Sequence, residues 1–247
     1  MSADGMGPTT VVGMEDGALT PEILERIRTL PLFAGLDRTG LAGLLGGAEL
    51  CSVERDAVMF RQGEPADRFY IVLSGRVVLL VMDNAARESV IEVVKPGDTF
   101  GEEAIFDHGL FPFGARVIEP ARLVHVPAAS FLASLATDFK FVMMMLASMS
   151  AHLRFLVRQV GELKLKTTEQ RLGSYLLAQT LEGQASATVL LPYDKKILAS
   201  QLGMTPESLS RALAKLRDVG VSSGNSSLTI ADVARLRAFC RESDISE

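Results

Sequence analysis

The sequence has few of the residues that form disulfides, thiolate clusters and imidazole sites. It contains two cysteines, Cys51 and Cys240, three histidines and no tryptophan in 247 residues. Two distant thiols exclude a disulfide framework and a four-thiolate iron–sulfur cluster, and they indicate a reducing compartment. We therefore expect no metal site and place the protein in the cytoplasm.

Export and membrane signals are also missing. Residues 1–20 have no cationic start and no apolar core, and they are rich in glycine and small residues, which predicts a disordered tail. No apolar run reaches membrane-spanning length, so we expect no membrane partner. A hydrophobic content of 48% supports real cores, and the length allows one large domain or two ordinary ones.

Neither positive nor negative charge dominates the chain, but the charged residues are unevenly distributed along it. The net charge is −5, whereas the segment 154–218 holds ten Lys or Arg against six Asp or Glu. An acidic part is thus joined to a mildly basic one. This distribution suits a sensor attached to a DNA-binding module.

The first half of the chain reads as short strands after two short helices. We predict helices over residues 21–30 and, capped by Asp37, up to Leu45. Short apolar runs follow at 58–60, 69–73, 76–81, 89–94 and 122–127, broken by turn sequences such as QGEPAD, SG, KPGD and EPA. Strands of this length with such turns predict an antiparallel β-barrel or jelly roll over residues 21–137.

A long helix is predicted over residues 138–165, where apolar residues recur at alternating intervals of four and three. This spacing is that of a coiled-coil seam and predicts a parallel homodimer, although packing on the chain's own barrel is the alternative. The residues of the predicted seam are Val142, Leu146, Met149, Leu153, Leu156, Val160 and Leu163.

Residues 194–216 predict a helix-turn-helix. One helix runs to Leu202, Gly203 breaks it, and Thr205-Pro206 is a strong start for a second. The second helix carries Glu207, Ser210 and Arg211 on one outward face, and in a helix-turn-helix that helix enters the DNA major groove. Arg donates to guanine, Glu accepts from cytosine and Ser reaches a base or a phosphate, although an ordinary helical hairpin is the alternative.

Further helices and strands complete the predicted DNA-binding domain, residues 166–247. A helix over 168–181 precedes the helix-turn-helix, a two-stranded wing follows around Gly224-Asn225, and a helix over 231–242 ends the chain. We expect contacts to the DNA backbone from the residues that flank the recognition face, which are Lys195, Lys196, Thr205, Ser208 and Lys215.

The order of β-roll, long helix and winged helix-turn-helix resembles the CRP/FNR family of bacterial transcription regulators. FRQGEPADRFYIVLSGRVVL, KPGDTFGEEAIF and GMTPESLSRALAKL carry the resemblance. It implies an α+β fold with a cyclic-nucleotide-binding-like domain, a homodimer on double-stranded DNA and RNA polymerase as a partner. In its FNR-like branch, Glu207, Ser210 and Arg211 would recognise TTGAT-like half-sites in an inverted repeat, and Pro206 replaces a DNA-contacting Arg of CRP.

The resemblance leaves the effector open. The family's nucleotide cassette combines a Gly-Glu turn, here Gly101-Glu102, with a later Arg-Ser. Phe111, Pro112, Phe113 and Gly114 stand where that pair is expected. Arg116 is out of register, so cAMP is disfavoured because its phosphate would lack a cation. A regulator that binds cAMP through Arg116 remains an alternative.

Haem is a further alternative, because the chain also resembles the DNR regulators of the nitric oxide response. His108, His125 and His152 are the candidate ligands, and haem rests on analogy alone. An FNR-type cluster is disfavoured because there are only two cysteines. A regulatory module of a kinase or channel and a metal-dependent cupin enzyme are also disfavoured, since the chain has no kinase motif and no clustered histidines.

Overall fold

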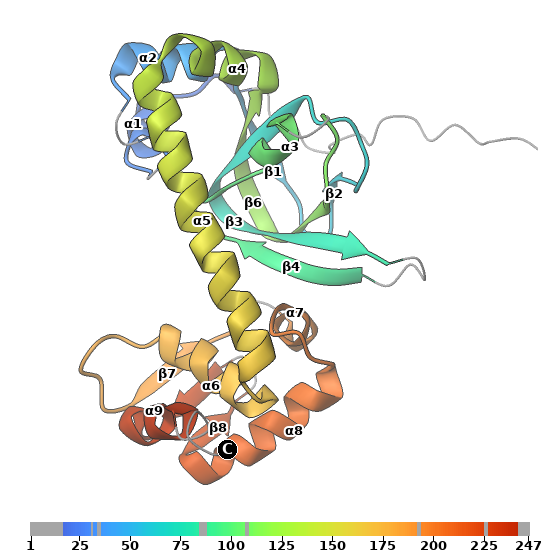
Figure 1. Ribbon diagram of the computed structural model, residues 1–247, viewed down its shortest axis with the longest axis vertical. Coiled ribbons are helices and arrows are strands. Elements are labelled where there is room, and N and C mark those ends of the chain that lie inside the picture. The colour runs from blue at the N-terminus through green and yellow to red at the C-terminus, as the bar shows by residue number, and fades with distance from the viewer. Residues whose placement is uncertain are drawn as a thin grey trace, which may run out of the picture. The chain divides into compact units, whose positions relative to one another are not determined.

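The computed structural model describes residues 17–30, 32–33, 36–83, 88–106, 109–191, 194–224 and 227–241 (Figure 1). Contacts divide the chain into two compact units, Met1–His152 and Leu153–Glu247. The division falls inside one long helix, α5 (Phe139–Leu165), whereas the boundaries predicted from the sequence lie at the two ends of that helix. Most of the predicted tail, residues 1–16, lies outside the described residues, and Gly17 forms a β-bridge with Leu50.

The first unit is built on an antiparallel six-stranded sheet that curls into a roll. The strand order is β1-β6-β3-β4, with β2 paired to β6 and β5 paired to β3. The strands, in chain order, are β1 (Glu49–Val53), β2 (Val58–Phe60), β3 (Arg68–Met82), β4 (Glu88–Val94), β5 (Thr99–Phe100) and β6 (Gly114–Pro127). This α+β arrangement confirms the predicted β-roll.

Two turns predicted from the sequence are wrong, because they are kinks within long strands. Ser74-Gly75 lies inside β3 and the EPA sequence lies inside β6. The register between these strands shifts at this point, where Gly75 faces Pro120 and Ala121. Gly75 has a φ of +79° and a Cβ there would overlap the backbone of both residues, so glycine allows the two strands to bend together.

Helices cover one side of the roll. Figure 1 shows α1 (Pro21–Arg28), α2 (Arg38–Leu44) and α4 (Ala128–Thr137) gathered around the first turns of α5. The predicted Asp37 cap is confirmed by its side chain, which accepts from the Gly40 N–H at 2.7 Å. Phe131 of α4 and Phe141 of α5 are fully buried there and meet edge to face. This apolar cluster joins the start of α5 to the sensor domain.

The second unit holds helices around a small antiparallel sheet of order β7-β9-β8. Its elements are α6 (Thr168–Ala178), β7 (Ala187–Leu190), α7 (Lys195–Gln201), α8 (Pro206–Leu216), the short 3-10 helix η1 (Arg217–Val219), β8 (Val221–Ser223), β9 (Ser227–Ile230) and α9 (Val233–Arg241). The predicted helices and the two wing strands are confirmed, while β7 was not predicted. Residues 225–226, at the predicted wing turn, lie outside the described residues.

α5 is also the one described helix that is long and apolar enough, by length and composition alone, to cross a membrane. The expectation that no apolar run reaches that length is therefore not met. The same criterion is satisfied by helices that pair through an apolar seam. Arg154 and Arg158 within α5 would each be costly at the centre of a bilayer.

Replacing Gly75 by Ala tests the paired kink of β3 and β6. We expect a loss of about 3 kcal/mol or more of unfolding free energy, because strain at positive φ adds to an overlap with backbone atoms. Gly63→Ala is the matched control, since Gly63 has a similar φ of +84° but a Cβ added there would have no neighbouring atom within 4 Å. It should cost about 1–2 kcal/mol in urea denaturation. Equal losses for the two variants would contradict the close approach.

Candidate nucleic-acid interface and sensor interior

The helix-turn-helix is formed by α7 and α8, and residues 202–205 connect the two helices. Asp194 caps α7 by accepting from the Lys196 N–H at 3.0 Å, and Thr205 caps α8 by accepting from the Ser208 N–H at 3.2 Å. Gly203 adopts φ +62° in the turn, a conformation that favours glycine. The predicted break and the predicted helix start are therefore both confirmed.

α8 has one buried face and one exposed face. Leu209, Ala212 and Leu216 are buried in the core of the second unit. Glu207, Ser210 and Arg211 are all exposed and lie at i, i+3 and i+4, so they share one face of the helix. The structure thus brings together the three residues that the sequence assigned to base recognition.

The three polar side chains on this face differ in charge and in hydrogen bonding. Hydrogen bonds to the Glu207 backbone N–H and to Thr205 lower the pKa of the Glu207 carboxyl, so it is an ionised acceptor at neutral pH. The Ser210 hydroxyl donates to the Pro206 carbonyl oxygen at 2.9 Å, which means that it must rotate to reach a base. Arg211 contributes a positive charge next to Glu207.

The residues expected to contact the DNA backbone lie in three places. Lys195 and Lys196 are exposed in the first turn of α7, and the Lys195 ammonium lies 3.4 Å from the Ser223 hydroxyl of strand β8. Thr205 and Ser208 form the cap of α8. Lys215 is engaged elsewhere, because its ammonium lies 2.7 Å from a carboxylate oxygen of Glu169 on α6.

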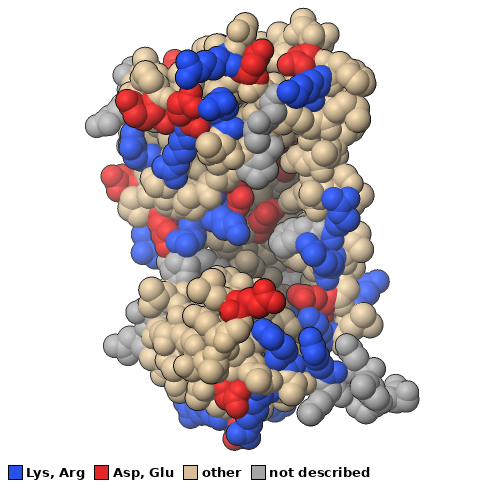
Figure 2. All heavy atoms as spheres, turned by 90° about the vertical axis from the view of Figure 1, so that its left-hand side faces the viewer, with Lys and Arg blue, Asp and Glu red and all other residues tan. Residues whose placement is uncertain are grey.

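On the face that Figure 2 draws, Lys and Arg side chains are interspersed with Asp and Glu. A face of mixed charge attracts DNA less strongly at long range than a continuous basic area would.

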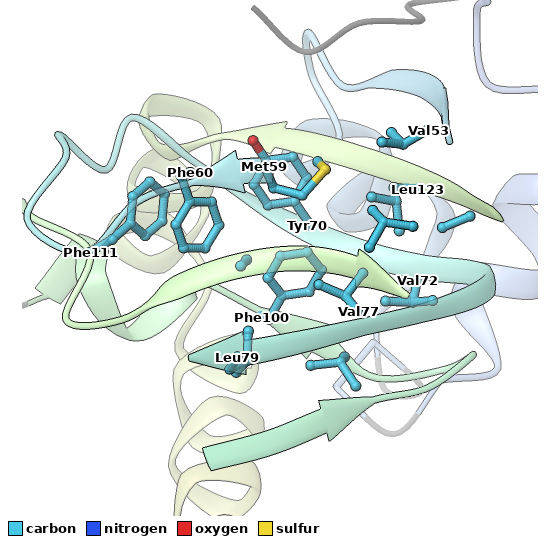
Figure 3. Close-up of a cluster of buried hydrophobic side chains, with 14 of the residues drawn as sticks. Val53, Met59, Phe60, Tyr70, Val72, Val77, Leu79, Phe100, Phe111 and Leu123 are labelled. Atoms are coloured by element: carbon cyan, nitrogen blue, oxygen red, sulfur yellow. The ribbon is translucent and has the colours of Figure 1, made fainter. Parts of the chain in front are cut away.

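The interior of the β-roll is filled by aromatic side chains. Phe60 and Phe111 stack with ring centroids 3.6 Å apart and planes 11° apart, and Tyr70 stacks on Phe100 at 5.0 Å (Figure 3). Phe113 approaches Phe60 at 6.2 Å. Phe111 and Phe113, which stand in the region of the expected Arg-Ser pair, are buried, so these side chains fill part of the interior. The sequence identified the two cassette phenylalanines, but not their stacking partner Phe60.

The Gly-Glu turn lies beside this aromatic cluster. Gly101 has a φ of +91°, and a Cβ there would lie 3.1 Å from the Phe111 ring. Glu102 begins the short helix α3 (Glu102–Phe106), and its Oε1 accepts from the Thr99 hydroxyl at 2.7 Å. Its Oε2 is buried without a hydrogen-bond partner. Burial and the neighbouring Glu103 raise the pKa of Glu102 to about 7.

The predicted seam of α5 faces away from the cores of its own chain. Leu146, Met149, Leu153, Val160 and Leu163 are exposed, Leu153 to 62%, while Val142 and Leu156 are partly buried. Phe141 and Met145, on another side of the helix, are buried in the first unit. An apolar stripe of this length leaves a large area in contact with water in a single chain.

Comparisons with known proteins place both parts of the chain in one family. Residues 50–138 match the cyclic nucleotide-binding domain, and residues 170–239 match the Crp-like helix-turn-helix domain. A crystal structure from Ruegeria pomeroyi, a candidate cyclic nucleotide binding protein, is 32% identical, with 88% of this chain and 96% of that chain covered and a TM-score of 0.62. The chain belongs to the CRP/FNR family.

Two further relatives agree with this assignment. The CRP-like cAMP-activated global transcriptional regulator of Mycobacterium tuberculosis is 26% identical over 85% of this chain and 96% of its own. The crystal structure of DNR from Pseudomonas aeruginosa is 28% identical over 89% of this chain and 99% of its own, with a TM-score of 0.51. The chain is thus a DNA-binding transcription regulator of the CRP/FNR type.

The residues of this family member do not fit a cyclic nucleotide well. Ala115 and Val117 of β6 point into the interior, so Arg116 between them faces the other side of the strand. Its guanidinium binds both carboxylate oxygens of Glu88, at 3.2 and 2.7 Å. The cation suspected from the sequence is therefore committed to another partner outside the interior.

The histidines give no geometric support for haem. His125 is held near Glu49, with its Nε2 3.6 Å from the carboxylate, and burial lowers the pKa of its imidazole. His152 is exposed on α5, and His108 lies outside the described residues. Among the described residues, no three His, Cys, Asp or Glu side chains form a group that could hold a metal ion.

The raised pKa of Glu102 predicts a pH-dependent stability. A carboxyl that binds its proton more tightly in the folded state stabilises the protein at acidic pH, and this contribution is lost as the pH rises through about 7. Unfolding free energy should therefore fall between about pH 4.5, the unfolded value, and about pH 7, and stay level above that range. Glu102→Gln, which mimics the protonated acid, should match the wild type at the acidic end and exceed it by up to about 3 kcal/mol at the basic end.

The control for this measurement is Glu119→Gln on the surface of β6. It forms an ion pair with Arg76, and the two side chains are 27% and 30% exposed. This variant should not gain stability relative to the wild type as the pH rises. If Glu102→Gln and the wild type change in parallel over the whole window, the Glu102 carboxyl does not titrate as described.

Proposed function

We propose that the protein acts as a homodimer that binds an inverted repeat of TTGAT-like half-sites, under control of a signal received by the β-roll. The observation that carries this proposal is the exposed face of α8, on which Glu207, Ser210 and Arg211 stand together. Glu can accept from cytosine N4 and Arg can donate two hydrogen bonds to guanine. The turn that starts α8 is capped by Thr205 and carries Pro206 where CRP has a DNA-contacting Arg.

The dimer follows from the exposed seam of α5. Pairing α5 with its copy would remove the exposed side chains of Leu146, Leu153 and Val160 from water, and a sustained four-three spacing favours two strands. Two linked recognition helices would then read two half-sites related by a twofold axis. As a regulator of this kind, the protein would meet RNA polymerase on DNA in the cytoplasm, without a membrane partner and without an enzymatic reaction.

The signal is not cAMP in this proposal. Stacked phenylalanines occupy the roll interior, and the Arg116 guanidinium is bound to Glu88. Burying the cyclic phosphate without a cation would be costly. The cAMP-responsive alternative would require Arg116 to leave Glu88 and change strand face, and the haem-responsive alternative would require the aromatic cluster to open.

Binding to defined DNA tests the recognition proposal. The wild type should bind a palindrome of two TTGAT half-sites, and bind a single half-site much more weakly because only one recognition helix is then engaged. Arg211→Ala should lose about 1–3 kcal/mol of discrimination at one guanine of each half-site. Gel shifts on the palindrome and on copies substituted at each base pair measure both effects.

Lys196→Ala is the matched control for Arg211→Ala. It removes an exposed cation from the first turn of α7, so it should weaken binding to all sequences about equally and reduce the salt dependence of binding. Unchanged base selectivity in Arg211→Ala would remove this residue from base recognition. Equal affinity of the wild type for the palindrome and for random DNA would refute the proposed half-site.

Thermal melting with and without cAMP tests the sensor proposal. A ligand that binds only the folded state at 100 times its dissociation constant adds about 2.7 kcal/mol, which raises the melting temperature by several degrees. We expect no such shift for the wild type with millimolar cAMP. The double variant Phe113→Arg/Gly114→Ser supplies the missing pair and should begin to respond. A clear shift in the wild type would mean that another cation reaches the phosphate.

A further inference from the structure

An ion pair joins the last turn of the recognition helix to the first turn of α6. The Lys215 ammonium lies 2.7 Å from Glu169 Oε1, and the Glu169 side chain is 13% exposed whereas that of Lys215 is 71% exposed. Glu169 is therefore the fixed partner, and Lys215 reaches across to it. The bond spans two helices that pack on each other in the core of the second unit.

The Glu169 carboxylate is also held by groups of its own helix, α6, in addition to Lys215. Oε2 accepts from the Thr168 hydroxyl at 3.1 Å, and Thr167 and Gln170 form a capping box at the start of the same helix. Lys215 first, and then the backbone and threonine hydrogen bonds, lower the pKa of Glu169 to about 2. An anion near a helix N-terminus is also favoured by the helix dipole. Glu169 is thus charged at every physiological pH.

α6 also reaches the other end of the recognition helix. Gly203, in the turn that leads into α8, lies beside Arg171: a Cβ at Gly203 would be 3.4 Å from Arg171 Nη1 and 2.6 Å from Leu163 Cδ2 of α5. The Arg171 Nε is buried without a hydrogen-bond partner. A buried guanidinium nitrogen left unpaired is costly, so Arg171 does not gain its position from a hydrogen bond at this atom.

We propose that Glu169 and Arg171 are positioning residues, which set the orientation of the recognition helix from the junction of α5 and α6. Glu169 holds the end of α8 through Lys215, and Arg171 lies against the turn at its start. In this role Lys215 is bound to protein and not to a DNA phosphate, so the proposal replaces the backbone contact expected for Lys215. It rests on the proposed DNA recognition by α8.

The arrangement gives the last turns of α5 two routes to the recognition helix. Leu163 packs directly at Gly203, and Lys166, which follows α5, binds both Glu162 at 2.8 Å and the Ser174 hydroxyl of α6 at 2.9 Å. A rotation of α6 relative to the end of α5 would therefore move both ends of α8. The base-contacting face would turn with it.

A charge swap tests the pair. Glu169→Lys and Lys215→Glu should each lower the ratio of palindrome affinity to random-DNA affinity by about 3- to 10-fold, because orientation matters for bases whereas the changed net charge affects both DNAs alike. The double variant Glu169→Lys/Lys215→Glu restores the pair with its sense reversed. We expect its palindrome affinity to return to within about 3-fold of the wild type.

The salt dependence separates positioning from phosphate contact. If Lys215 touches a phosphate, Lys215→Glu weakens all sequences, the slope of log affinity against log salt falls by about one or more, and the swap remains weak. That result overturns the proposal. Arg171→Met is a second variant and should lower palindrome affinity relative to random DNA, with Arg158→Met on the exposed part of α5 as its control.

Folding and the underlying function are checked in the same samples. Circular dichroism and sedimentation must show wild-type helix content and oligomeric state, and a variant that fails them is replaced by Glu169→Gln, which keeps the shape of the side chain. A wild type that does not prefer the palindrome refutes the half-site proposal and leaves no specific binding to position. A wild type that prefers it, with additive effects of the two single variants, refutes the positioning role alone.

Discussion

One helix, α5, contributes to both compact units, and it cannot bury all of its apolar side chains within one chain. Phe141 and Met145 enter the core of the first unit, and Leu163 packs at the turn of the helix-turn-helix. Between them a stripe of leucine, methionine and valine stays exposed. Exposed apolar area of this extent is unfavourable in water, and in the proposed homodimer a second copy of α5 would cover it. The proposed dimer seam therefore lies on the same helix that belongs to both compact units.

The sensor domain combines a familiar fold with an altered interior. The cassette keeps its Gly-Glu turn, and Glu102 keeps a buried oxygen with no partner beside the aromatic cluster. Of the phenylalanines that stand in place of the Arg-Ser pair, Phe111 stacks on Phe60 and Phe113 lies tilted beside it, and both are buried in the interior. The domain thus has the fold of a cyclic nucleotide-binding domain, with an interior filled by its own aromatic side chains.

The DNA-binding domain separates recognition from support. The outward face of α8 presents groups that can read bases, and its inward face packs with α6 in the core of the second unit. Glu169 of α6 binds the exposed Lys215, and Arg171 lies beside the turn that leads into α8. Lys195 links α7 to the wing through Ser223. None of these contacts involves Glu207, Ser210 or Arg211, the residues proposed to read bases.

Local signals in the sequence were enough for the helices, their caps and the recognition face. Asp37, Gly203 and Thr205-Pro206 each act on residues a few positions away in the sequence. The four-three spacing of α5 and the i, i+3, i+4 spacing on α8 depend only on the geometry of a single helix. The missing Arg-Ser pair was equally visible, because it is a matter of residue type. These features depend on no distant partner.

Tertiary structure decided what depends on residues far apart in the chain. The SG and EPA sequences look like turns, yet pairing of β3 with β6 makes them facing kinks, because the hydrogen bonds of two long strands outweigh a local preference. The position of Arg116 in the sequence predicted a place near the effector. In the structure, side chains alternate along β6, so Arg116 lies on the opposite face of the strand and binds Glu88. Nothing in the sequence pairs Lys215 with Glu169, 46 positions earlier, which the fold brings within 2.7 Å of it. A sequence specifies which charges exist, but only the packed chain decides which of them meet.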